Sequence, residues 1–396
     1  LDTVEKDSDV YASVIRIKKQ FATGIISFPC VDGFYIYAPK NDMFVTQLNS
    51  YIYETSSNFA CSHAISSLLR NAEKEKEPLD MTQWFLLHVK NESYLLEYYH
   101  LCKSGEKLIG QELMTALDMY ASELNFNEYR LYLKPAHKRI NFIEKHIKHF
   151  EAPFAGKPFL LTIEQKAIAE TLFGYQYFDP EYNKWVRRFQ EILLLMARKN
   201  GKTPFLAALA LADFFCGTMG QKFLCASNDH EQASLVFDCI NNFREESNIL
   251  ERCTRKNNQG IFFGNRKQKK KKGKYTKQNK GSIKKMSAKS GAKEGRNLKF
   301  AIVDEVHEMK DDKTVMPVRT SLTTQEEPVY FEITTEGVVT DGYLDKRLAE
   351  ARKVLKGELK RTRWLIWLYT QDSEQEVWQD ESTWVKSNPL LGVCKK

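Results

Sequence analysis

The sequence of 396 residues predicts an α/β fold with a mostly parallel central sheet, helices on both faces of the sheet, and a helical N-terminal region before it. Two observations support this prediction. From about Pro153 onward, short apolar segments alternate with amphipathic segments of helical length, which is typical of strands connected by helices. From Trp84 to Phe150, the spacing of apolar residues is helical instead.

The predicted elements follow one another along the chain. Thr162 is a plausible cap for a helix that ends near Phe173, and Gly217 is placed to end the helix after the first sheet strand. Strands are expected at 34–39, 192–197, 222–227, 300–304, 329–333 and 364–369, and the later helices at 203–216, 230–243 and 341–357.

These elements divide the chain into four regions. Residues 1–85 form an N-terminal region of unknown role, and 86–152 form a helical N-terminal or lid region. The core is expected at 153–340, interrupted at 264–297 by a basic insertion that we expect to be disordered. Residues 341–396 then form a C-terminal lid or linker.

A candidate phosphate-binding loop follows the first strand of the core. It consists of Ala197, Arg198, Lys199, Asn200, Gly201, Lys202 and Thr203, between an apolar strand and an apolar helix. Backbone amides and the helix N-terminus suit phosphates, Lys202 neutralises charge, and the Thr203 hydroxyl can reach Mg²⁺. The usual motif has glycine where this chain has Met196, and a Gly-Lys-Thr sequence alone often only opens a helix.

A second apolar strand ends in two carboxylates, Asp304 and Glu305. Asp304 is suited to hold magnesium, and Glu305 to polarise a water molecule. Together with the loop, this pair predicts a P-loop nucleoside triphosphatase in which Glu305, Arg198 and Lys202 act in catalysis. Arg198 is either a solvated loop residue or an arginine finger that stabilises charge on the transferred phosphoryl group.

The positive charge is concentrated in one segment. Eleven of the 59 basic residues lie between Gly264 and Lys285, where there is no acidic residue; the rest of the chain has 48 basic and 51 acidic residues. The densest run contains Lys269, Lys270, Lys271, Lys272 and Lys274. Such a run is a solvated insertion, a contact for the phosphate backbone of nucleic acid, or a nuclear-localisation patch.

Composition also excludes some classes of protein. The chain has no apolar stretch close to the roughly 18–20 residues of a membrane span, and its first residues lack the profile of a signal peptide. Its eight cysteines are scattered and form no Cys-x-x-Cys pair. We therefore expect reduced thiols, an intracellular location and no association with a membrane.

Several blocks, taken in order, resemble the large terminase subunit of tailed bacteriophages, and the resemblance runs from about residue 90 to 392. The loop sequence Arg-Lys-Asn-Gly-Lys-Thr is the most specific of them, since this family typically lacks the first glycine. The blocks lie at 110–113, 139–144, 156–159, 165, 173–174, 197–203, 302–308, 333–337 and 384–392.

The resemblance implies an ATP-driven motor that packs double-stranded DNA into a procapsid. It implies that Gln165 reads the adenine edge, and that Arg198 and Lys202 contact the terminal phosphates of ATP. Thr203 and Asp304 would hold Mg²⁺, while Glu305 would be the general base or would orient the water. Thr334 and Thr335 match the motif that couples hydrolysis to the elements gripping DNA; otherwise they form an ordinary turn after a strand.

The implied partners are double-stranded DNA, the small terminase subunit and the portal protein of the procapsid, with a homo-oligomeric ring as the active form. The implied location is the cytoplasm of the bacterial host. Family members normally continue into a nuclease domain, and this sequence ends about where that domain is expected to begin, so we expect ATPase but not nuclease activity.

Two alternatives remain: a truncated prophage remnant that binds nucleotide or DNA without catalysis, and another DNA-dependent P-loop ATPase. A two-lobed helicase is disfavoured, because only 59 residues follow Gly337 and a second motor domain does not fit in that length.

Overall fold

The computed structural model describes residues 93–392, except 182, 228–229, 265–280, 288–296, 314 and 338. It also describes two short strands, β1 (Ile25–Pro29) and β2 (Tyr35–Pro39), which pair antiparallel. β2 confirms the strand expected at 34–39. The other predictions for residues 1–85, and those for the lysines at 269–274, lie outside the described residues.

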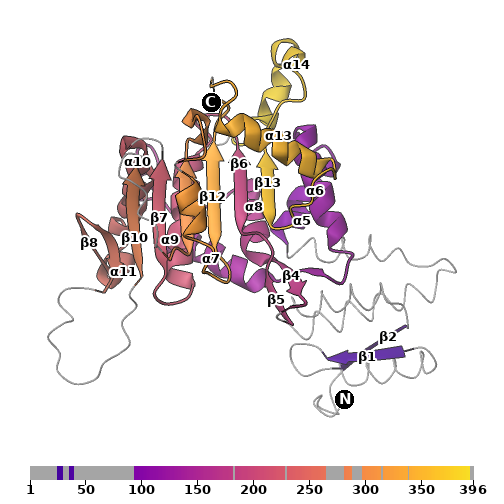
Figure 1. Cartoon of the computed structure of the whole chain (residues 1–396), viewed down its shortest axis with the longest axis horizontal. Helices are drawn as coiled ribbons and strands as arrows, with labels where there is room; N and C mark the ends of the chain where they lie inside the picture. The colour runs from indigo at the N-terminus through magenta and orange to yellow at the C-terminus, as the bar shows by residue number, and fades with distance from the viewer. Residues whose placement is uncertain are drawn as a thin grey trace.

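The centre of the molecule is an eight-stranded sheet in the order β13-β6-β12-β11-β7-β10-β9-β8 (Figure 1). The strands from β13 to β10 in this order are parallel to their neighbours, whereas β9 and β8 form an antiparallel edge. Their bounds are β6 Glu191–Leu195, β7 Lys222–Ser227, β8 Thr254–Asn257, β9 Gly260–Phe263, β10 Ser282–Ser287, β11 Phe300–Asp304, β12 Val329–Thr334 and β13 Trp364–Leu368.

The register of this sheet brings distant residues to one edge. Thr334 lies opposite Leu195, and Ile333 lies opposite Asp304. The carboxyl ends of β6, β12 and β11 are therefore level, with β12 in the middle. Two strand spacings, roughly 10 Å, separate β6 from β11, so the loop after β6 and the carboxylates after β11 open at the same edge.

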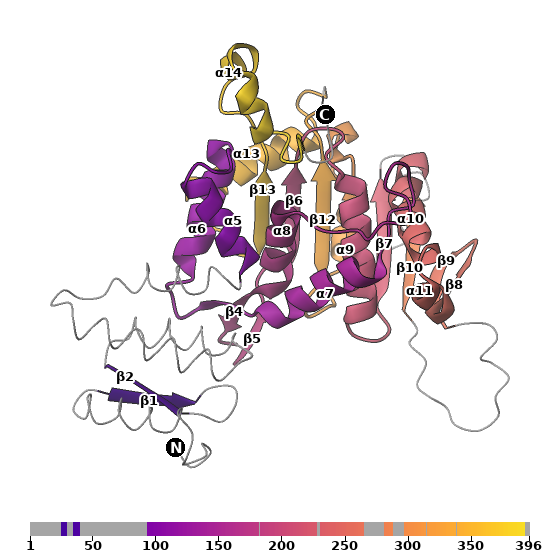
Figure 2. The same ribbon diagram turned by 180° about the vertical axis from the view of Figure 1, so that it is seen from behind.

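Helices cover both faces of the sheet, as expected for parallel strands that are buried on two sides. On one face, Ile192 and Leu194 pack with α5–α11; on the other, Leu193 and Leu195 pack with η3, α12 and α13 (Figures 1 and 2). The first set is α5 Tyr94–Lys103, α6 Gln111–Glu123, α7 Leu133–His146, α8 Ile163–Gly174, α9 Lys202–Cys216, α10 His230–Glu245 and α11 Asn248–Cys253; the second is η3 Val306–Glu308, α12 Met316–Thr320 and α13 Tyr343–Leu355.

The α/β prediction is confirmed, including the mostly parallel sheet and the helical segment before it. Helices α5, α6 and α7 share one continuous core with the sheet rather than forming a core of their own. A small antiparallel sheet joins β3 (Tyr129–Leu131), β4 (Tyr175–Asp179) and β5 (Lys184–Arg187). The described chain ends with α14 (Glu374–Gln379) and η4 (Glu381–Lys386).

The prediction of a disordered insertion at 264–297 is wrong for residues 282–287. Residues Ser282–Ser287 form β10, which is parallel to β7 and continues the sheet. Ile283 and Met286 are buried, while the ammonium groups of Lys284 and Lys285 reach the ring of Phe262 and the hydroxyl of Ser234. Lysines at strand positions extend their charged ends past the apolar surface, and this concealed a strand inside a basic run.

Among the helices that the structure describes, none combines the length and the apolar composition needed to cross a lipid bilayer. The five cysteines in the described part of the chain are free thiols.

Candidate active site

The loop predicted to bind phosphate connects β6 to α9 at the carboxyl edge of the sheet (Figure 1). Its backbone takes left-handed conformations at Lys199 (φ 67°) and at Gly201 (φ 64°), and Gly201 caps the helix. Arg198 and Lys199 are exposed, whereas Asn200 is buried. Left-handed residues before a helix turn successive amides toward one side, which suits binding of an anion.

Lys202 occupies the first position of α9 and is buried. Its Nζ donates to the carbonyl oxygens of Met196 at 3.1 Å and Ala197 at 3.0 Å. These contacts hold the ammonium group against the loop, where a negatively charged phosphate would compete for it. Thr203 follows in the same turn and is half-buried.

The C-terminal part of the described chain packs directly on this loop. The side chain of Asn200 donates to the Oδ1 of Asn388 at 3.1 Å and accepts from the backbone N–H of Leu390 at 3.2 Å. The backbone N–H of Ala197 donates to the carbonyl oxygen of Ser387 at 3.0 Å. The block at 384–392 had no role in the sequence analysis beyond its resemblance, because no local pattern reveals contacts between residues 188 positions apart.

Asp304 ends β11 and is 3% exposed. Its Oδ1 accepts a hydrogen bond from the backbone N–H of Glu305 at 2.9 Å. Burial, followed by the neighbouring charge of Glu305, raises the pKa of Asp304 to about 7, while the nearby ammonium of Lys202 acts in the opposite direction. The structure therefore brings the predicted metal ligand into electrostatic range of the loop, in a place where its negative charge is poorly compensated.

Glu305 adopts a left-handed backbone conformation (φ 52°) as the chain turns from β11 into η3. Its Oε2 lies 3.0 Å from Nδ1 of His307. Thr334, predicted to belong to a coupling motif, donates from Oγ1 to the carbonyl oxygen of Thr335 at 2.8 Å and contacts His307 as well. Both threonines are buried. The predicted catalytic carboxylate and the end of β12 thus meet at His307, a residue of the block at 302–308.

Gln165 lies in the first turn of α8. Its Oε1 accepts a hydrogen bond from the backbone N–H of Thr162 at 3.1 Å, so the side chain caps the helix. The role of Gln165 toward adenine stays a prediction.

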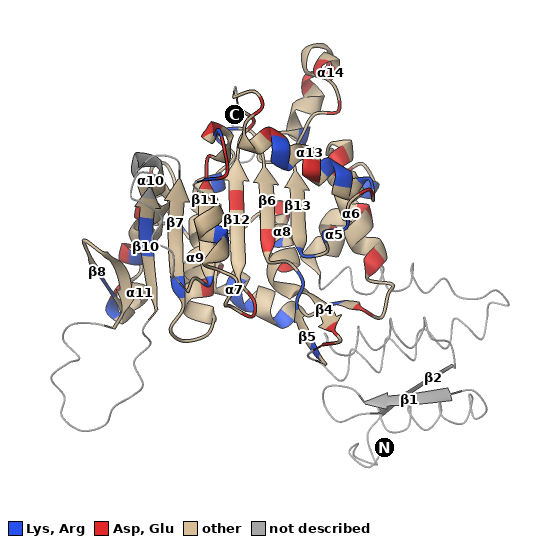
Figure 3. Cartoon of the chain, in the orientation of Figure 1, with Lys and Arg blue, Asp and Glu red and all other residues tan. Residues whose placement is uncertain are grey.

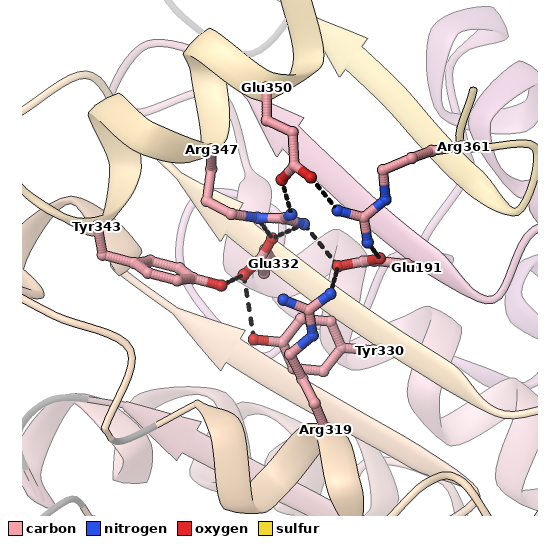
Figure 4. Close-up of polar contacts among 8 residues, drawn as sticks. All are labelled: Glu191, Arg319, Tyr330, Glu332, Tyr343, Arg347, Glu350 and Arg361. Carbon is pink, nitrogen blue, oxygen red and sulfur yellow. Dashed lines mark hydrogen bonds and ion pairs between the residues drawn. The ribbon is translucent and has the colours of Figure 1, made fainter. Parts of the chain in front are cut away.

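A second cluster of charge lies on the α13 face of the sheet (Figure 4), and Figure 3 shows acidic residues within β6 and β12. Glu191 is the first residue of β6, and Glu332 lies within β12. Arg347 donates to Glu332 at 2.8 and 3.0 Å and to Glu191 at 2.6 Å. Glu191 also accepts from Arg319 and Arg361, at 2.5 and 2.8 Å. We call this the arginine–glutamate cluster: Arg319, Arg347, Arg361, Glu191, Glu332 and Glu350.

The arginine–glutamate cluster is electrically balanced, with three charges of each sign. Burial alone would lower the pKa of Arg347, but Glu332 and Glu191 outweigh burial and raise it. Tyr330 and Tyr343 donate to the remaining oxygen of Glu332. Since every charge has partners, the cluster is a structural feature rather than a binding site.

A cavity of about 1010 Å³ lies between α10, α11 and the β8–β10 edge of the sheet. None of the predicted site residues lines this cavity, so its size does not indicate the position of the candidate active site. The basic residues that face it are Arg244, Arg252, Arg255, Lys256 and Lys285.

Comparison with known proteins relates this site to a family. Residues 165–353 match the family model described as "Terminase large subunit, ATPase domain". Over these residues the chain is similar to the ATPase domain of terminase large subunits. The matched region includes the loop, Asp304, Glu305 and Thr334, but it ends before the segment that packs on the loop.

Individual relatives agree with this assignment. Over 228 residues, or 57% of its length, the chain is 28% identical to the terminase large subunits of Lactococcus phage p2 and Lactococcus phage SK1. The aligned part spans 40% of each of these relatives. The crystal structure of the HK97 bacteriophage large terminase has the same fold, with a TM-score of 0.52 at 21% identity, over 66% of this chain and 49% of that one.

Proposed function

We propose that this chain is the ATPase part of a DNA-packaging motor, which uses ATP and Mg²⁺ to translocate double-stranded DNA into a procapsid. One observation carries the proposal: a buried carboxylate with little compensation, Asp304, stands at the same sheet edge as the loop that contains Lys202. Within a terminase ATPase domain, this pairing suits a divalent ion on one side of the phosphates and an ammonium group on the other.

The residues present fit a magnesium ion. Burial raises the pKa of Asp304 to about 7, because a negative charge is unfavourable in its poorly solvated surroundings. A bound cation would compensate that charge. Asp304 and the hydroxyl of Thr203 would hold the ion. When bound, it would supply charge stabilisation on the phosphoryl oxygens.

The side chains then have separate tasks. The backbone amides from Ala197 to Gly201 would bind the phosphates, and Lys202 would exchange its two carbonyl partners for phosphate oxygens. Arg198, exposed on the loop, would stabilise charge on the transferred group. Glu305 would orient the attacking water and accept its proton, for in-line attack on the terminal phosphorus. Gln165 would recognise the adenine edge.

Steady-state hydrolysis of ATP by the purified chain tests this proposal. We expect Glu305→Gln and Lys202→Ala to lower the turnover number by roughly 1000-fold, since each removes one stabilising or proton-accepting group from the transition state. The assay is run with and without double-stranded DNA. Wild-type activity no higher than that of Glu305→Gln under both conditions would instead identify a remnant without catalysis.

The lysines at 269–272 and 274 would contact the phosphate backbone of DNA. The described chain that leads into that segment is also basic: Arg255 donates to the carbonyl oxygen of Gly264, and Arg252 and Lys256 line the same cavity as Arg255. Contacts to phosphates release counterions, so affinity falls steeply with salt. We expect deletion of residues 266–280 to flatten the salt dependence of DNA binding; an unchanged slope would leave the segment as a solvated loop.

The assembly around this domain is also a proposal. A homo-oligomeric ring, the small terminase subunit and the portal protein are the partners that a packaging motor requires, and the bacterial cytoplasm is where it would meet them. Thr334 and Thr335 would couple hydrolysis to the movement of DNA. The position of these two threonines supports this role. Thr334 is the last residue of β12 and Thr335 follows it, and β12 lies between β6 and β11 in the sheet.

A further inference from the structure

His307 lies where two functional segments meet, the turn after β11 and the end of β12. It is 7% exposed. Its backbone N–H and its Nδ1 are both 3.2 Å from Oγ1 of Thr334, and the same Nδ1 is 3.0 Å from Oε2 of Glu305. One ring nitrogen is therefore within reach of both the candidate general base and the candidate coupling residue.

The surrounding groups determine which way the hydrogen bonds run. Thr334 uses its one hydroxyl hydrogen on the carbonyl oxygen of Thr335, at 2.8 Å, so its Oγ1 can only accept from His307. An ionised carboxylate also only accepts. Nδ1 of His307 must therefore carry a hydrogen, and this single N–H is shared between Thr334 and Glu305.

The sharing is unequal in this conformation. Nδ1 is hydrogen-bonded to Thr334, whereas Oε2 of Glu305 is buried and has no well-aligned hydrogen bond in the described structure, although Nδ1 is only 3.0 Å away. The Glu305 side chain keeps 28% of its surface exposed, none of it at Oε2. A buried carboxylate oxygen without a good donor is costly, so a small rotation of the imidazole toward Glu305 is favourable once Thr334 shifts.

Gly337 fixes the ring from the other side. A Cβ atom on this glycine would lie 2.5 Å from Cδ2 and 2.7 Å from Cβ of His307, closer than side chains can approach. The φ of Gly337 is outside the left-handed region, so contact with His307, not backbone conformation, requires glycine here. The segment from Thr334 to Gly337 thus touches the histidine at its first and last residues.

We propose that His307 is a positioning residue that orients the carboxylate of Glu305 and makes this orientation depend on the end of β12. This inference rests on the proposed ATPase function and deepens it. When the end of β12 shifts, the Nδ1–H of His307 leaves Oγ1 of Thr334 and donates its hydrogen bond to Oε2 of Glu305, while the hydrogen stays on Nδ1. The other carboxylate oxygen is then directed toward the water that it activates. Glu305 remains the group that touches the water.

Steady-state kinetics of ATP hydrolysis by the full chain tests the inference. For His307→Ala we expect a turnover number about 10- to 100-fold lower, as for other residues that orient a catalytic group, with unchanged KM for ATP and unchanged melting temperature. His307→Asn places an amide N–H near the position of Nδ1 and should recover most of the turnover. Gly337→Ala, which displaces the ring but retains it, should lower turnover in the same way.

A double-mutant cycle examines the link to β12. Because Thr334→Val removes the acceptor that competes for the same hydrogen, the double variant with His307→Ala should be no slower than His307→Ala alone. Additive losses would overturn the link. Turnover of His307→Ala within twofold of wild type, or a loss confined to KM, would overturn the positioning role. Wild-type activity equal to that of Glu305→Gln would overturn the proposed ATPase function, and this inference with it.

Discussion

Two regions of the central sheet bury charge, and they treat it in opposite ways. In the arginine–glutamate cluster, Glu332 is fully buried, yet it accepts hydrogen bonds from Arg347, Tyr330 and Tyr343. At the carboxyl edge, Asp304 is nearly as buried, but its side chain accepts a hydrogen bond from one backbone N–H, and the neighbouring charge that acts on its pKa most strongly is another carboxylate, Glu305.

This difference in hydrogen-bond partners separates buried charge that stabilises the fold from buried charge that remains available to a ligand. A buried ion pair with complete hydrogen bonding has no remaining capacity for a ligand, so the arginine–glutamate cluster holds β6, β12 and α13 together. An uncompensated carboxylate costs stability and persists where a ligand will compensate it. Burial alone therefore does not identify a site; the balance of charge around the buried group does.

The first prediction concerns the arginine–glutamate cluster and has the largest expected effect on stability. Glu332→Gln removes the negative charge to which Arg347 donates from both Nε and Nη2. It should lower the free energy of unfolding by about 3 kcal/mol, measured by urea denaturation at pH 8. Glu350→Gln is the matched control: Glu350 is 32% exposed, so it should cost less than about 1 kcal/mol. Equal losses for the two variants would contradict our view of the cluster.

The second prediction concerns the carboxyl edge of the sheet, where we expect a substitution to stabilise the folded chain. Asp304→Asn should raise the free energy of unfolding without ligand by about 1–4 kcal/mol at pH 8 while abolishing hydrolysis. A carboxyl whose pKa is raised to about 7 on folding opposes folding fully above pH 7 and progressively less as pH falls toward 4. The gain should therefore be smaller at pH 5.5 than at pH 8.

A paired aspartate provides the control for that experiment. Asp213 is also buried, but Arg139 donates to it at 2.6 and 2.8 Å. Asp213→Asn should therefore destabilise the chain at pH 8. If Asp304→Asn destabilised the chain to a similar extent, the two buried carboxylates would be equivalent, and the contrast between the regions would be lost.

The third prediction is the smallest and concerns the loop itself. Asn388→Ala removes the acceptor for the Asn200 side chain and should weaken ATP binding by about 1 kcal/mol, or roughly fivefold, because the loop loses a contact that holds its shape. Equilibrium titration with a fluorescent ATP analogue measures this. Asn297→Ala, at an exposed position that contacts Thr324 and Gln325, should have no effect; equal losses would remove Asn388 from the site.

Sequence patterns predicted most of the sheet, because strand and helix signals are local. The strands at Lys222–Ser227 and Phe300–Asp304 were predicted with their observed bounds, and those containing Glu191 and Val329 differ by one or two residues. β10 was missed because its lysines dominated the composition of the segment. The edge strands β8 and β9 were missed because each has only four residues, too few to show a period, and β8 contains no apolar residue.

The candidate site also has features that the sequence predicts and features that it does not. Sequence patterns alone pointed to the groups that could bind phosphate and metal, because Lys202 and Thr203 open a helix after one recognisable strand, and Asp304 and Glu305 follow the apolar part of another. The three-dimensional structure was needed to show which buried charges are compensated, that Asn388 contacts the loop through Asn200, and that His307 lies between Glu305 and Thr334. The physical reason is that periodicity and capping depend on neighbours along the chain, whereas charge balance and hydrogen-bond partners depend on neighbours in space.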